Sequence, residues 1–389
     1  SSCNFFRSLG LDYLYVGEGN DIPSLVAAFA KVKDTSRPTV VHIHTQKGKG
    51  YAPAEADREE FHWEMPFDLE TGKPKVDCSG MEDYHSLTGK FLLEKMKEDH
   101  TVVAISSGTP TVIGFTPERR KQAGRQFVDV GIAEEHAVAL ASGIAAGGGR
   151  PVYGVYSTFI QRCYDQLSQD LCINGNPAVI TVFMGTVAGM NDVTHLGFFD
   201  IPLISNIPNM VYLAPTCSEE YFAMLEWAVR QTEYPVAIRV PGVAVVHRKE
   251  EFDTDYSELN RYKMTARGET VAILALGSFY DLGQALKNKL REESGVEATL
   301  INPRYITGLD EPMLEELKVG HRIVVTLEDG VLDGGFGEKI ARYYGNSEMR
   351  VLNYGLRKEF ADRYNLDELM KTNRLTDKQM AEDIAGILE

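Results

Sequence analysis

Short apolar runs, several of them rich in β-branched residues, recur along the chain and predict β-strands. Longer segments with apolar residues at helical spacing separate several of these runs and predict helices. Up to residue 240 the predicted strands are 39–45, 101–106, 127–130, 152–156, 178–184, 211–214 and 236–240, and the predicted helices are 133–146, 157–173 and 218–231. Because strands alternate with helices, we expect a mostly parallel sheet covered by helices on both faces.

A second stretch with the same pattern follows a polar segment. Residues 245–268 are charged and lack apolar periodicity, which indicates an interdomain linker. Beyond it the predicted strands are 270–276, 298–302, 322–328 and 350–354, and the predicted helices are 281–293 and 335–344. The expected fold class is therefore α/β, with two doubly wound, mostly parallel-sheet domains.

Composition and charge narrow the class of protein. The 389 residues are 43% hydrophobic and 25% charged, which is typical of a soluble globular protein. The formal net charge of −16 argues against nucleic acid as the main partner, because phosphate binding needs a high density of basic residues. A local exception is the lysine-containing run Gln46–Gly50, which is either a small anion site or a solvated loop.

The cysteines and the terminus bear on cellular location. The five cysteines, at positions 3, 78, 163, 172 and 217, form no CxxC pair and indicate free thiols in a reducing compartment. No apolar run reaches the roughly eighteen residues of a membrane span, and no signal-peptide pattern is present, so we expect a cytoplasmic protein without a membrane partner. The chain begins at Ser1 with sequence that already has a folded composition. We therefore expect an upstream portion to have been removed or to belong to another chain.

The octapeptide Asp129-Val-Gly-Ile-Ala-Glu-Glu-His136 combines a short apolar strand with the start of a helix. Glu134 would lie in the first helical turn with apolar residues around it. A carboxylate in such a low-dielectric place suits acid–base work on a bound heterocycle. Alternatively, acidic residues here only complement the helix dipole. The octapeptide by itself supports both interpretations about equally.

Two further loops follow strands of the same predicted sheet, and ligands of parallel sheets gather at the carboxyl ends of strands. After strand 152–156, Tyr156 and Phe159 with Arg162 could hold a flat ring and an anion, although core packing and a surface ion pair are the simpler interpretation in isolation. After strand 178–184, glycines, small polar residues and His195 are typical of a substrate-binding loop, although a lone loop histidine is more often structural. The joint occurrence of three such loops favours a functional site.

Several motifs occur in an order that resembles the thiamine-diphosphate-dependent transketolase superfamily, and most closely the 1-deoxy-D-xylulose-5-phosphate synthase family. They are DVGIAEEH at 129–136, YSTFIQRCYDQ at 156–166, THLGFFD at 194–200, LEDGVLDGGFG at 327–337 and, near the start, HIHTQKGKGYAPAE at 42–55 with Phe61 and His62. The resemblance implies four segments. They are the C-terminal remnant of a diphosphate-binding domain (1–80), a pyrimidine-binding domain (81–244), a linker (245–268) and a transketolase C-terminal domain (269–389).

The resemblance also implies an activity, a cofactor and an assembly. Members of the family transfer a two-carbon unit from a 2-keto donor, such as pyruvate with decarboxylation, to an aldose or aldose phosphate. They serve isoprenoid and thiamine biosynthesis. The implied cofactor is thiamine diphosphate with Mg²⁺, the implied ligands are small-molecule substrates, and the implied assembly is a homodimer.

Roles for individual residues follow from the matched family positions. The glutamate that matches Glu134 hydrogen-bonds the aminopyrimidine ring of the cofactor, and Phe159 would stack on that ring. His195 and His62 match histidines that face the substrate and could move protons. The full set comprises Glu134, His195 and His62 as catalytic residues, Glu134, Tyr156, Phe159, Arg162 and Lys47 as cofactor-binding residues, and Tyr156, Asn191 and His195 as substrate-binding residues.

One departure from the family concerns the diphosphate half of the site. The family holds the diphosphate through magnesium with a Gly-Asp-Gly motif followed by a distant Asn, and this pair does not occur in the chain. The run Gly17-Glu-Gly-Asn20 is not that motif. We therefore expect the metal ligands on a missing N-terminal diphosphate-binding domain or fragment, and no catalytic competence without it.

A second departure concerns the acceptor. Met184 and Gly242 occupy the positions of two family arginines that grip the acceptor phosphate, and Asn191 stands where the family has an aspartate. Methionine and glycine cannot imitate the bidentate, permanently charged contact of a guanidinium group. The acceptor is therefore expected to differ, either as another sugar or as one without phosphate at that position.

Two alternative assignments remain open. The chain could be another transketolase or resemble a 2-oxo acid dehydrogenase β-subunit, although the segment 1–74 ahead of the pyrimidine domain argues against a natural subunit start. It could also be a binding or regulatory homologue without catalysis, which would fit the missing magnesium motif. Retention of Glu134, Phe159 and His195 argues against that second alternative.

Overall fold

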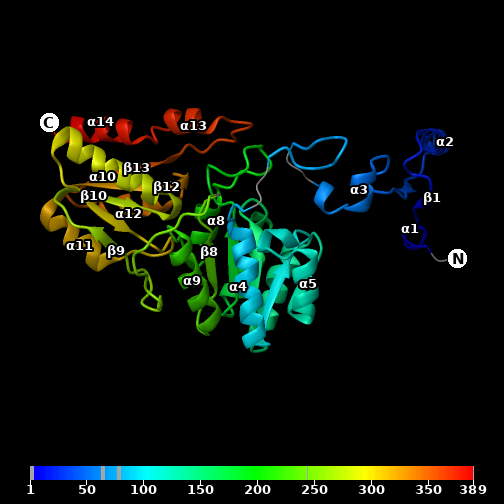
Figure 1. Ribbon diagram of the computed structural model, residues 1–389, viewed down its shortest axis with the longest axis horizontal. Coiled ribbons are helices and arrows are strands. Elements are labelled where there is room, and N and C mark those ends of the chain that lie inside the picture. Colours follow the sequence, from blue (N-terminus) through cyan, green and yellow to red (C-terminus); the bar gives the residue numbers. More distant parts are fainter. Residues whose placement is uncertain (1–3, 63–65, 77–79, 243, 389) are drawn as a thin grey trace. The chain divides into compact units, whose positions relative to one another are not determined.

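The computed structural model describes residues 4–62, 66–76, 80–242 and 244–388 (Figure 1). The chain divides into two compact units, residues 1–81 and 82–389. The second unit contains two sheets in which nearly all strand pairs are parallel, with helices packed against them. The predicted α/β fold class is therefore confirmed.

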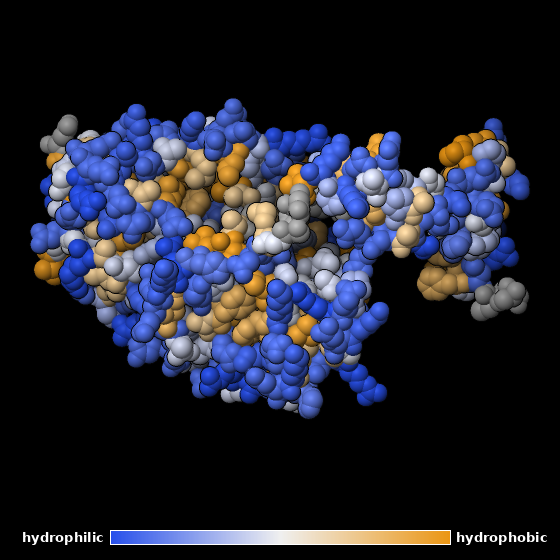
Figure 2. Space-filling view, viewed as in Figure 1, coloured by the Kyte–Doolittle hydropathy of each residue, from blue (hydrophilic) through white to orange (hydrophobic). Residues whose placement is uncertain are grey.

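Unit 1 is a small α/β segment with an uncovered apolar surface. Its elements are α1 (Phe5–Ser8), β1 (Asp12–Val16), α2 (Ile22–Val32), β2 (Thr39–Ile43), α3 (Ala52–Ala56) and the 3-10 turn η1 (Glu60–His62), with β1 and β2 paired in parallel. On α2, Ile22, Val26 and Phe29 are 67%, 62% and 51% exposed, and their spacing places them on one helix face. Figure 2 shows apolar residues gathered where α2 lies. Two strands with an uncovered helix are only marginally stable on their own.

The first sheet of unit 2 has six parallel strands in the order β4-β3-β5-β6-β8-β7. Their bounds are Val102–Ser106 (β3), Phe127–Asp129 (β4), Arg150–Tyr156 (β5), Val179–Phe183 (β6), Val211–Leu213 (β7) and Val236–Arg239 (β8). In β5, Val152 packs with helices α4 (Tyr84–Glu98) and α9 (Ser218–Arg230), whereas Tyr153 packs on the other face with α6 (Glu134–Ala146). Both faces are thus covered, which explains why the strand sequences are mostly apolar.

The prediction of one continuous helix over 157–173 is wrong. This segment consists of the 3-10 turn η4 (Ile160–Cys163), the short helix α7 (Tyr164–Gln166) and the π-helix η5 (Leu167–Cys172). The N–H of Ile173 bonds to the carbonyl of Ser168 over 3.0 Å, an i to i+5 register. Such π turns cluster at functional sites. Apolar spacing does not distinguish an α from a π register over so few residues, so the sequence pattern could not reveal the change.

Shorter helices complete this part of the molecule. They are η2 (Pro110–Ile113), α5 (Pro117–Ala123), η3 (Gly124–Gln126) and α8 (Asp200–Ser205). The α8 helix follows the long loop after β6 and begins with a buried aspartate, Asp200. Asp200 takes part in the buried contact between the two sheets that is described below.

The second sheet of unit 2 has the order β13-β12-β10-β11-β9, with β9 antiparallel to β11 and the other pairs parallel. Its strands are β9 (Lys263–Ala266), β10 (Thr270–Ala275), β11 (Thr299–Asn302), β12 (His321–Val331) and β13 (Arg350–Leu356). The helices around it are η6 (Gly277–Phe279), α10 (Tyr280–Ser294), α11 (Glu311–Gly320), α12 (Phe336–Tyr344), α13 (Leu366–Thr372) and α14 (Asp377–Leu388). Strand β9 lies inside segment 245–268, which the sequence predicted to be linker. Its four residues pair with β11 along the edge of the sheet, and four residues are too few to display a strand periodicity.

Buried polar contacts join the two sheets. Both carboxylate oxygens of Asp200 accept hydrogen bonds from Arg239, at 2.7 Å from Nε and 3.1 Å from Nη2. The same Nη2 donates to the carbonyl of Asp329 in β12 over 2.6 Å. Asp329 in turn accepts the N–H of Val187 over 2.7 Å. All of these charged side chains are at least 95% buried, so each needs its partners to compensate the cost of burying its charge. These contacts fix the position of one sheet relative to the other.

Glu328 in β12 gives the second sheet a pH-dependent stability. Its carboxylate is fully buried and accepts the N–H groups of Phe336 and Gly337 at the start of α12, both at 2.8 Å. Burial raises the pKa of Glu328 to about 7, although these two bonds oppose the rise. Between pH 4.5 and 7 the unfolded chain has therefore lost a proton that the folded chain retains. Stability falls as pH rises through this window.

We expect the Glu328→Gln variant to remove this pH dependence. Relative to the variant, the wild type should lose about 3 kcal/mol of unfolding free energy between pH 4.5 and pH 8. Urea unfolding curves of both proteins at several pH values measure the difference. Glu359→Gln is the matched control, because Glu359 is exposed and its side chain has no partner among the described residues. Parallel pH profiles of wild type and Glu328→Gln would contradict the assignment.

Candidate active site

Glu134 lies at the carboxyl edge of the six-stranded sheet because the chain turns sharply after β4. The carboxylate of Asp129 accepts the N–H groups of Gly108 and Gly131 at 2.8 and 2.9 Å. Gly131 has a φ of +73°, a left-handed conformation that glycine adopts at little cost. Helix α6 begins shortly after this turn, with Glu134 as its first residue.

The Glu134 side chain is only 3% exposed. Its Oε2 accepts a hydrogen bond from Nη1 of Arg162 over 3.3 Å, and Arg162 is the sole partner of this carboxylate in the described part of the chain. The arginine itself is half-exposed. A buried carboxylate that uses one of its two oxygens has an acceptor to spare for an N–H donor of a ligand.

Aromatic side chains form a continuous series at the carboxyl edge of the same sheet. The ring centroids of Tyr156 and Phe159 are 5.6 Å apart, and those of Phe159 and His195 are 5.5 Å apart, both edge to face. The series continues from Tyr156 to His85 at 6.2 Å, and His85 stacks on Phe183 at 4.7 Å. Three predicted site residues, Tyr156, Phe159 and His195, are therefore brought together.

His85 is a member of this series that the sequence pattern did not single out. It lies in the first turn of α4, and its Nδ1 donates to the carbonyl of Val112 over 2.6 Å. Burial lowers its pKa, so the imidazole is neutral near pH 7. Nothing near His85 in the sequence resembles a site motif. Only the packing of α4 on the sheet brings it to Tyr156.

His195 is oriented by a carboxylate three residues before it. Oδ1 of Asp192 lies 2.9 Å from Nδ1 of His195 and accepts the hydroxyl hydrogen bond of Thr194 over 2.5 Å. These contacts lower the pKa of Asp192 to about 2, with the Thr194 bond as the largest cause. A carboxylate at Nδ1 fixes the tautomer of a histidine and leaves Nε2 for other contacts. The small polar residues of this loop were noted in the sequence, but the pairing of Asp192 with His195 was not predicted.

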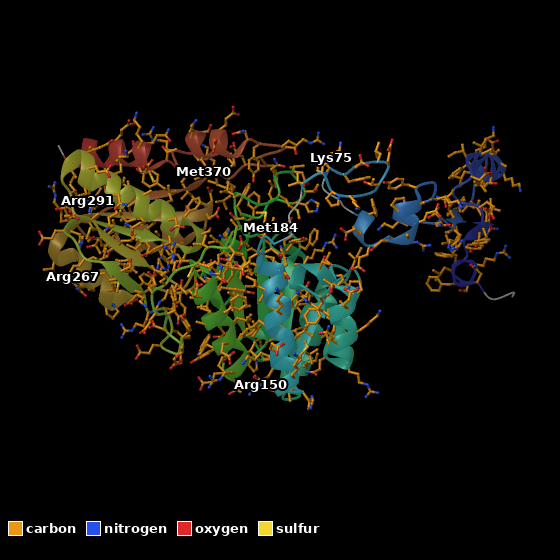
Figure 3. All side chains as sticks on the ribbon, in the orientation of Figure 1. Lys75, Arg150, Met184, Arg267, Arg291 and Met370 are labelled. Atoms are coloured by element: carbon orange, nitrogen blue, oxygen red, sulfur yellow. The ribbon has the colours of Figure 1, made fainter. Side chains whose placement is uncertain are left out.

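Asn191, Met184 and Gly242 mark the region predicted to receive the acceptor. The side chain of Asn191 is exposed, and its Nδ2 donates to the carbonyl of Tyr364 over 3.1 Å. Met184 directly follows β6 and is half-buried with a φ of +56° (Figure 3). Gly242 has a φ of +45° and open space around its Cα. No guanidinium group replaces the family arginines at either position.

The remaining two predicted site residues, Lys47 and His62, lie in unit 1 and contact each other. Nζ of Lys47 is 2.6 Å from Nδ1 of His62. An ammonium group can only donate, so Nδ1 of His62 accepts this bond. The segment between them is shaped by Glu55, which accepts the N–H of Gly50 over 2.8 Å. Unit 1 thus holds a compact Lys47–His62 pair, and unit 2 holds the other predicted residues.

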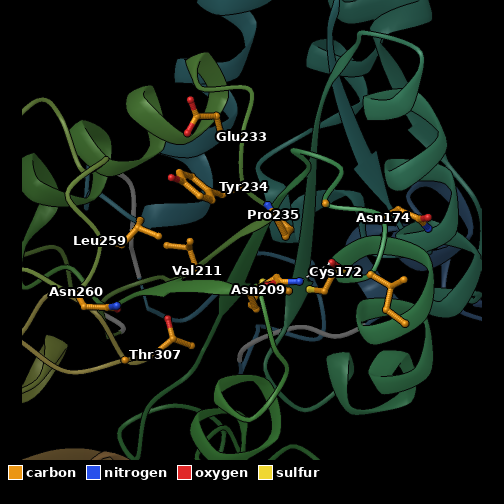
Figure 4. Close-up of a pocket in the computed structure, with 14 residues that line it drawn as sticks. Cys172, Asn174, Asn209, Val211, Glu233, Tyr234, Pro235, Leu259, Asn260 and Thr307 are labelled. Atoms are coloured by element: carbon orange, nitrogen blue, oxygen red, sulfur yellow. Dashed lines mark hydrogen bonds between the residues drawn. The ribbon is translucent and has the colours of Figure 1, made fainter.

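The hollows of unit 2 include two whose positions bear on the site. One, of about 280 Å³, lies beside the His195 loop and is lined by Ser157, Thr158, Gln161, Val193, Thr194, Leu196, Phe199, Asp200, Leu203 and Phe360. The other, of about 460 Å³, lies at the amino ends of β6, β7 and β8, at the opposite edge of the sheet from Glu134 (Figure 4).

Within the described part of the chain, the cysteines and metal-ligating side chains form no second centre. Cys163, Cys172 and Cys217 are free and buried, and burial raises the pKa of each thiol to about 11 or 12. Cys3 and Cys78 lie outside the described residues. Among the residues that the structure describes, no group of three or more His, Cys, Asp or Glu side chains could hold a metal ion. No described helix is long and apolar enough to span a membrane.

Comparisons with known proteins show which family the chain belongs to. The family model "Transketolase, pyrimidine binding domain" matches residues 82–245, and "Transketolase, C-terminal domain" matches residues 261–380. The chain belongs to the transketolase family. The family recognised from the motifs is therefore confirmed, and Glu134 lies in the pyrimidine-binding domain.

The curated relatives of this transketolase-family chain include 1-deoxy-D-xylulose-5-phosphate synthases of clostridia. The protein from Clostridium beijerinckii is 35% identical over 95% of this chain and 59% of its own length. The protein from Clostridium acetobutylicum is 34% identical over 98% of this chain and 60% of its own length. The chain therefore spans about 60% of the length of these relatives.

Solved structures agree with the fold. A split-gene transketolase, described as an inactive β4 tetramer, superposes with a TM-score of 0.65 at 20% identity and covers 79% of this chain and 98% of its own. A Pichia stipitis transketolase in complex with sedoheptulose-7-phosphate gives a TM-score of 0.62 at 13% identity, over 98% of this chain and 67% of its own. At these identities the likeness concerns the transketolase fold alone.

Proposed function

We propose that this chain supplies the pyrimidine-binding half of a thiamine-diphosphate site, and that the complete protein transfers a two-carbon unit to an aldehyde acceptor. The donor would be a 2-keto acid such as pyruvate, with loss of carbon dioxide. The observation that carries the proposal is the buried Glu134 carboxylate with one unused oxygen, at the same carboxyl edge of the sheet as the Tyr156 and Phe159 rings. The clostridial synthases, at about 35% identity, support the same chemistry.

The residues present fit the pyrimidine end of this cofactor. Glu134 offers an acceptor to a ring nitrogen that carries a proton, and the low exposure of its side chain keeps water from competing for that bond. Phe159 offers a flat apolar face, and Tyr156 lines the same side. When bound, thiamine diphosphate supplies the carbanion chemistry, so the protein's part is binding, orientation and proton movement.

His195 is proposed to face the substrate. Asp192 holds its Nδ1, so Nε2 is the atom that would give or take a proton as the acceptor reacts. Tyr156 and Asn191 are proposed to contact substrate beside it. Because Nδ2 of Asn191 is engaged by Tyr364, its Oδ1 is the atom left for a substrate hydroxyl. His62 and Lys47 are proposed to act from unit 1, on the substrate and the cofactor respectively.

The diphosphate half and its Mg²⁺ are proposed to come from further polypeptide. The uncovered face of α2, with Ile22, Val26 and Phe29, needs a partner surface of apolar character. A diphosphate-binding domain that continues the sheet of β1 and β2 would provide it, either in the same protein or as a separate chain. We further propose a cytoplasmic homodimer, and a role in isoprenoid or thiamine precursor synthesis as for the synthases.

The acceptor is proposed to lack the phosphate of the usual synthase acceptor. Met184 and Gly242 provide no charge, and Arg239, the guanidinium nearest in sequence to Gly242, is 4% exposed and committed to Asp200 and Asp329. A phosphate group would therefore find no bidentate donor at these positions.

The direct test uses the complete protein, with the diphosphate-binding part restored. We expect isothermal titration to show thiamine diphosphate binding that requires Mg²⁺, and we expect carbon dioxide release from pyruvate to be stimulated by unphosphorylated aldoses. The same chain without the diphosphate-binding part is the control and should neither bind the cofactor tightly nor turn over. Absence of cofactor binding by the complete protein would overturn the proposal and favour a non-catalytic module.

A further inference from the structure

The loop that carries His195, residues 187–195, is clamped by a short segment of the C-terminal domain. We call this segment, residues 360–364 between β13 and α13, the strap. The backbone N–H of Arg363 donates to the carbonyl of Asn191 over 2.6 Å. In return, Nδ2 of Asn191 donates to the carbonyl of Tyr364 over 3.1 Å. The middle of the loop is therefore held by two reciprocal hydrogen bonds.

The strap also holds the loop on either side of Asn191. The hydroxyl of Tyr364 donates to the carbonyl of Val187 over 2.6 Å, while the N–H of Val187 donates to Asp329 over 2.7 Å. Oδ1 of Asp362 accepts the N–H of Val193 over 3.1 Å. Beyond the loop, four residues after His195, the rings of Phe199 and Phe360 are 5.8 Å apart. These contacts join segments about 170 residues apart in sequence.

The geometry of the strap is specific. Arg363 has a φ of +47°, a left-handed conformation that costs a bulky residue about 1 kcal/mol or more and persists only where the surroundings demand it. That conformation lets the carboxylate at 362, the N–H at 363 and the carbonyl at 364 all face the loop. An aspartate at position 191 would place an acceptor against the Tyr364 carbonyl, whereas Asn191 donates to it.

We propose that the strap positions His195 by fixing the loop on both sides of the Asp192–His195 pair. Asn191 and Val193, the neighbours of Asp192, are both tied to the strap. Among the described residues, the hydrogen-bond partners of the Asp192 side chain are Thr194 and His195, both in the loop. The strap residues Asp362 and Tyr364 are therefore positioning residues that act through the loop. This inference rests on the proposed role of His195 at the substrate.

The test is the double variant Asp362→Ala with Tyr364→Phe in the complete protein. Amide hydrogen exchange over residues 187–195 should accelerate, and the imidazole signals of His195 in ring-labelled protein should shift toward those of an unrestrained histidine. Turnover should fall about 10- to 100-fold, since a catalytic group displaced by about 1 Å loses this much, while the KM for the 2-keto donor stays unchanged. Spectra of a His195→Gln variant identify the ring signals.

Two further variants separate positioning from general damage. Asp362→Asn keeps an oxygen acceptor for the N–H of Val193 and should resemble the wild type in all three measurements. Glu359→Ala removes a charge beside the strap without removing a described side-chain contact, and it should have no effect. If hydrogen exchange and ring signals are unchanged in the double variant, the strap does not hold His195. If they change while turnover is unchanged, the strap has no role in catalysis. If the wild type itself lacks activity, the proposed function fails, while exchange and ring signals still decide whether the strap holds His195.

Discussion

Replacement of Glu134 by Gln in the complete protein should lower turnover by about 10²- to 10⁴-fold, the range typical of a lost acid–base group. The reason is the chemistry of the site. The glutamine amide keeps the size of the side chain, but it cannot accept a proton or carry the charge that the Arg162 guanidinium faces. The variant should fold, because Glu134 contributes only one side-chain hydrogen bond and a favourable helix-dipole interaction of about 0.3–1 kcal/mol.

The neighbouring Glu135 provides the matched control for this prediction. It lies in the same first turn of α6, but its side chain is exposed. Glu135→Gln removes the same charge next to the same helix terminus, so a pure helix-dipole role would make the two variants alike. Steady-state kinetics with pyruvate, together with thermal unfolding of all three proteins, distinguish these cases. Equal activity of Glu134→Gln and Glu135→Gln would remove Glu134 from the mechanism.

The fold was predictable wherever the sequence pattern is local. β5 and β6 are mostly apolar because both faces of the sheet are covered, and α6 follows a strand and a glycine turn. The π-helical segment 167–172 and the edge strand β9 were missed because each depends on a hydrogen-bond register that side-chain periodicity does not record. The short helices between strands likewise depend on tertiary packing more than on their own sequence.

The site was predictable to the extent that its residues follow strands. Phe159 and His195 stand in loops and Glu134 begins a helix, each after a parallel strand of one sheet, so their placement at one edge of that sheet follows from the topology. His85 and Tyr364 reach the same edge from elements far away in sequence, α4 and the segment after β13. Such contacts cannot be predicted from a local motif, because they form only when the two sheets and their helices pack together.

Restoring an arginine at position 184 should shift acceptor preference toward phosphorylated aldehydes. Met184 already adopts a left-handed backbone conformation with a φ of +56°. Replacing it by arginine therefore adds no new backbone strain. Hydrogen bonds to a charged group contribute about 1.5–3 kcal/mol, which corresponds to about a 10- to 100-fold change in the ratio of kcat/KM values. The ratio to measure compares an aldose phosphate with the same aldose without phosphate.

Position 242 offers a second, less favourable place for the same change. Gly242 has room for a side chain, because no atom lies within 4 Å of the point where a Cβ would stand, but its φ of +45° strains any residue other than glycine by about 1–2 kcal/mol. Gly242→Arg should therefore add to the effect of Met184→Arg in acceptor preference while it lowers the unfolding temperature. Met184→Gln, which is polar and uncharged, is the control that separates charge from shape. If Met184→Arg and Met184→Gln change the preference equally, the distal end of the acceptor does not lie at Met184, and the loss of the family arginines has another cause.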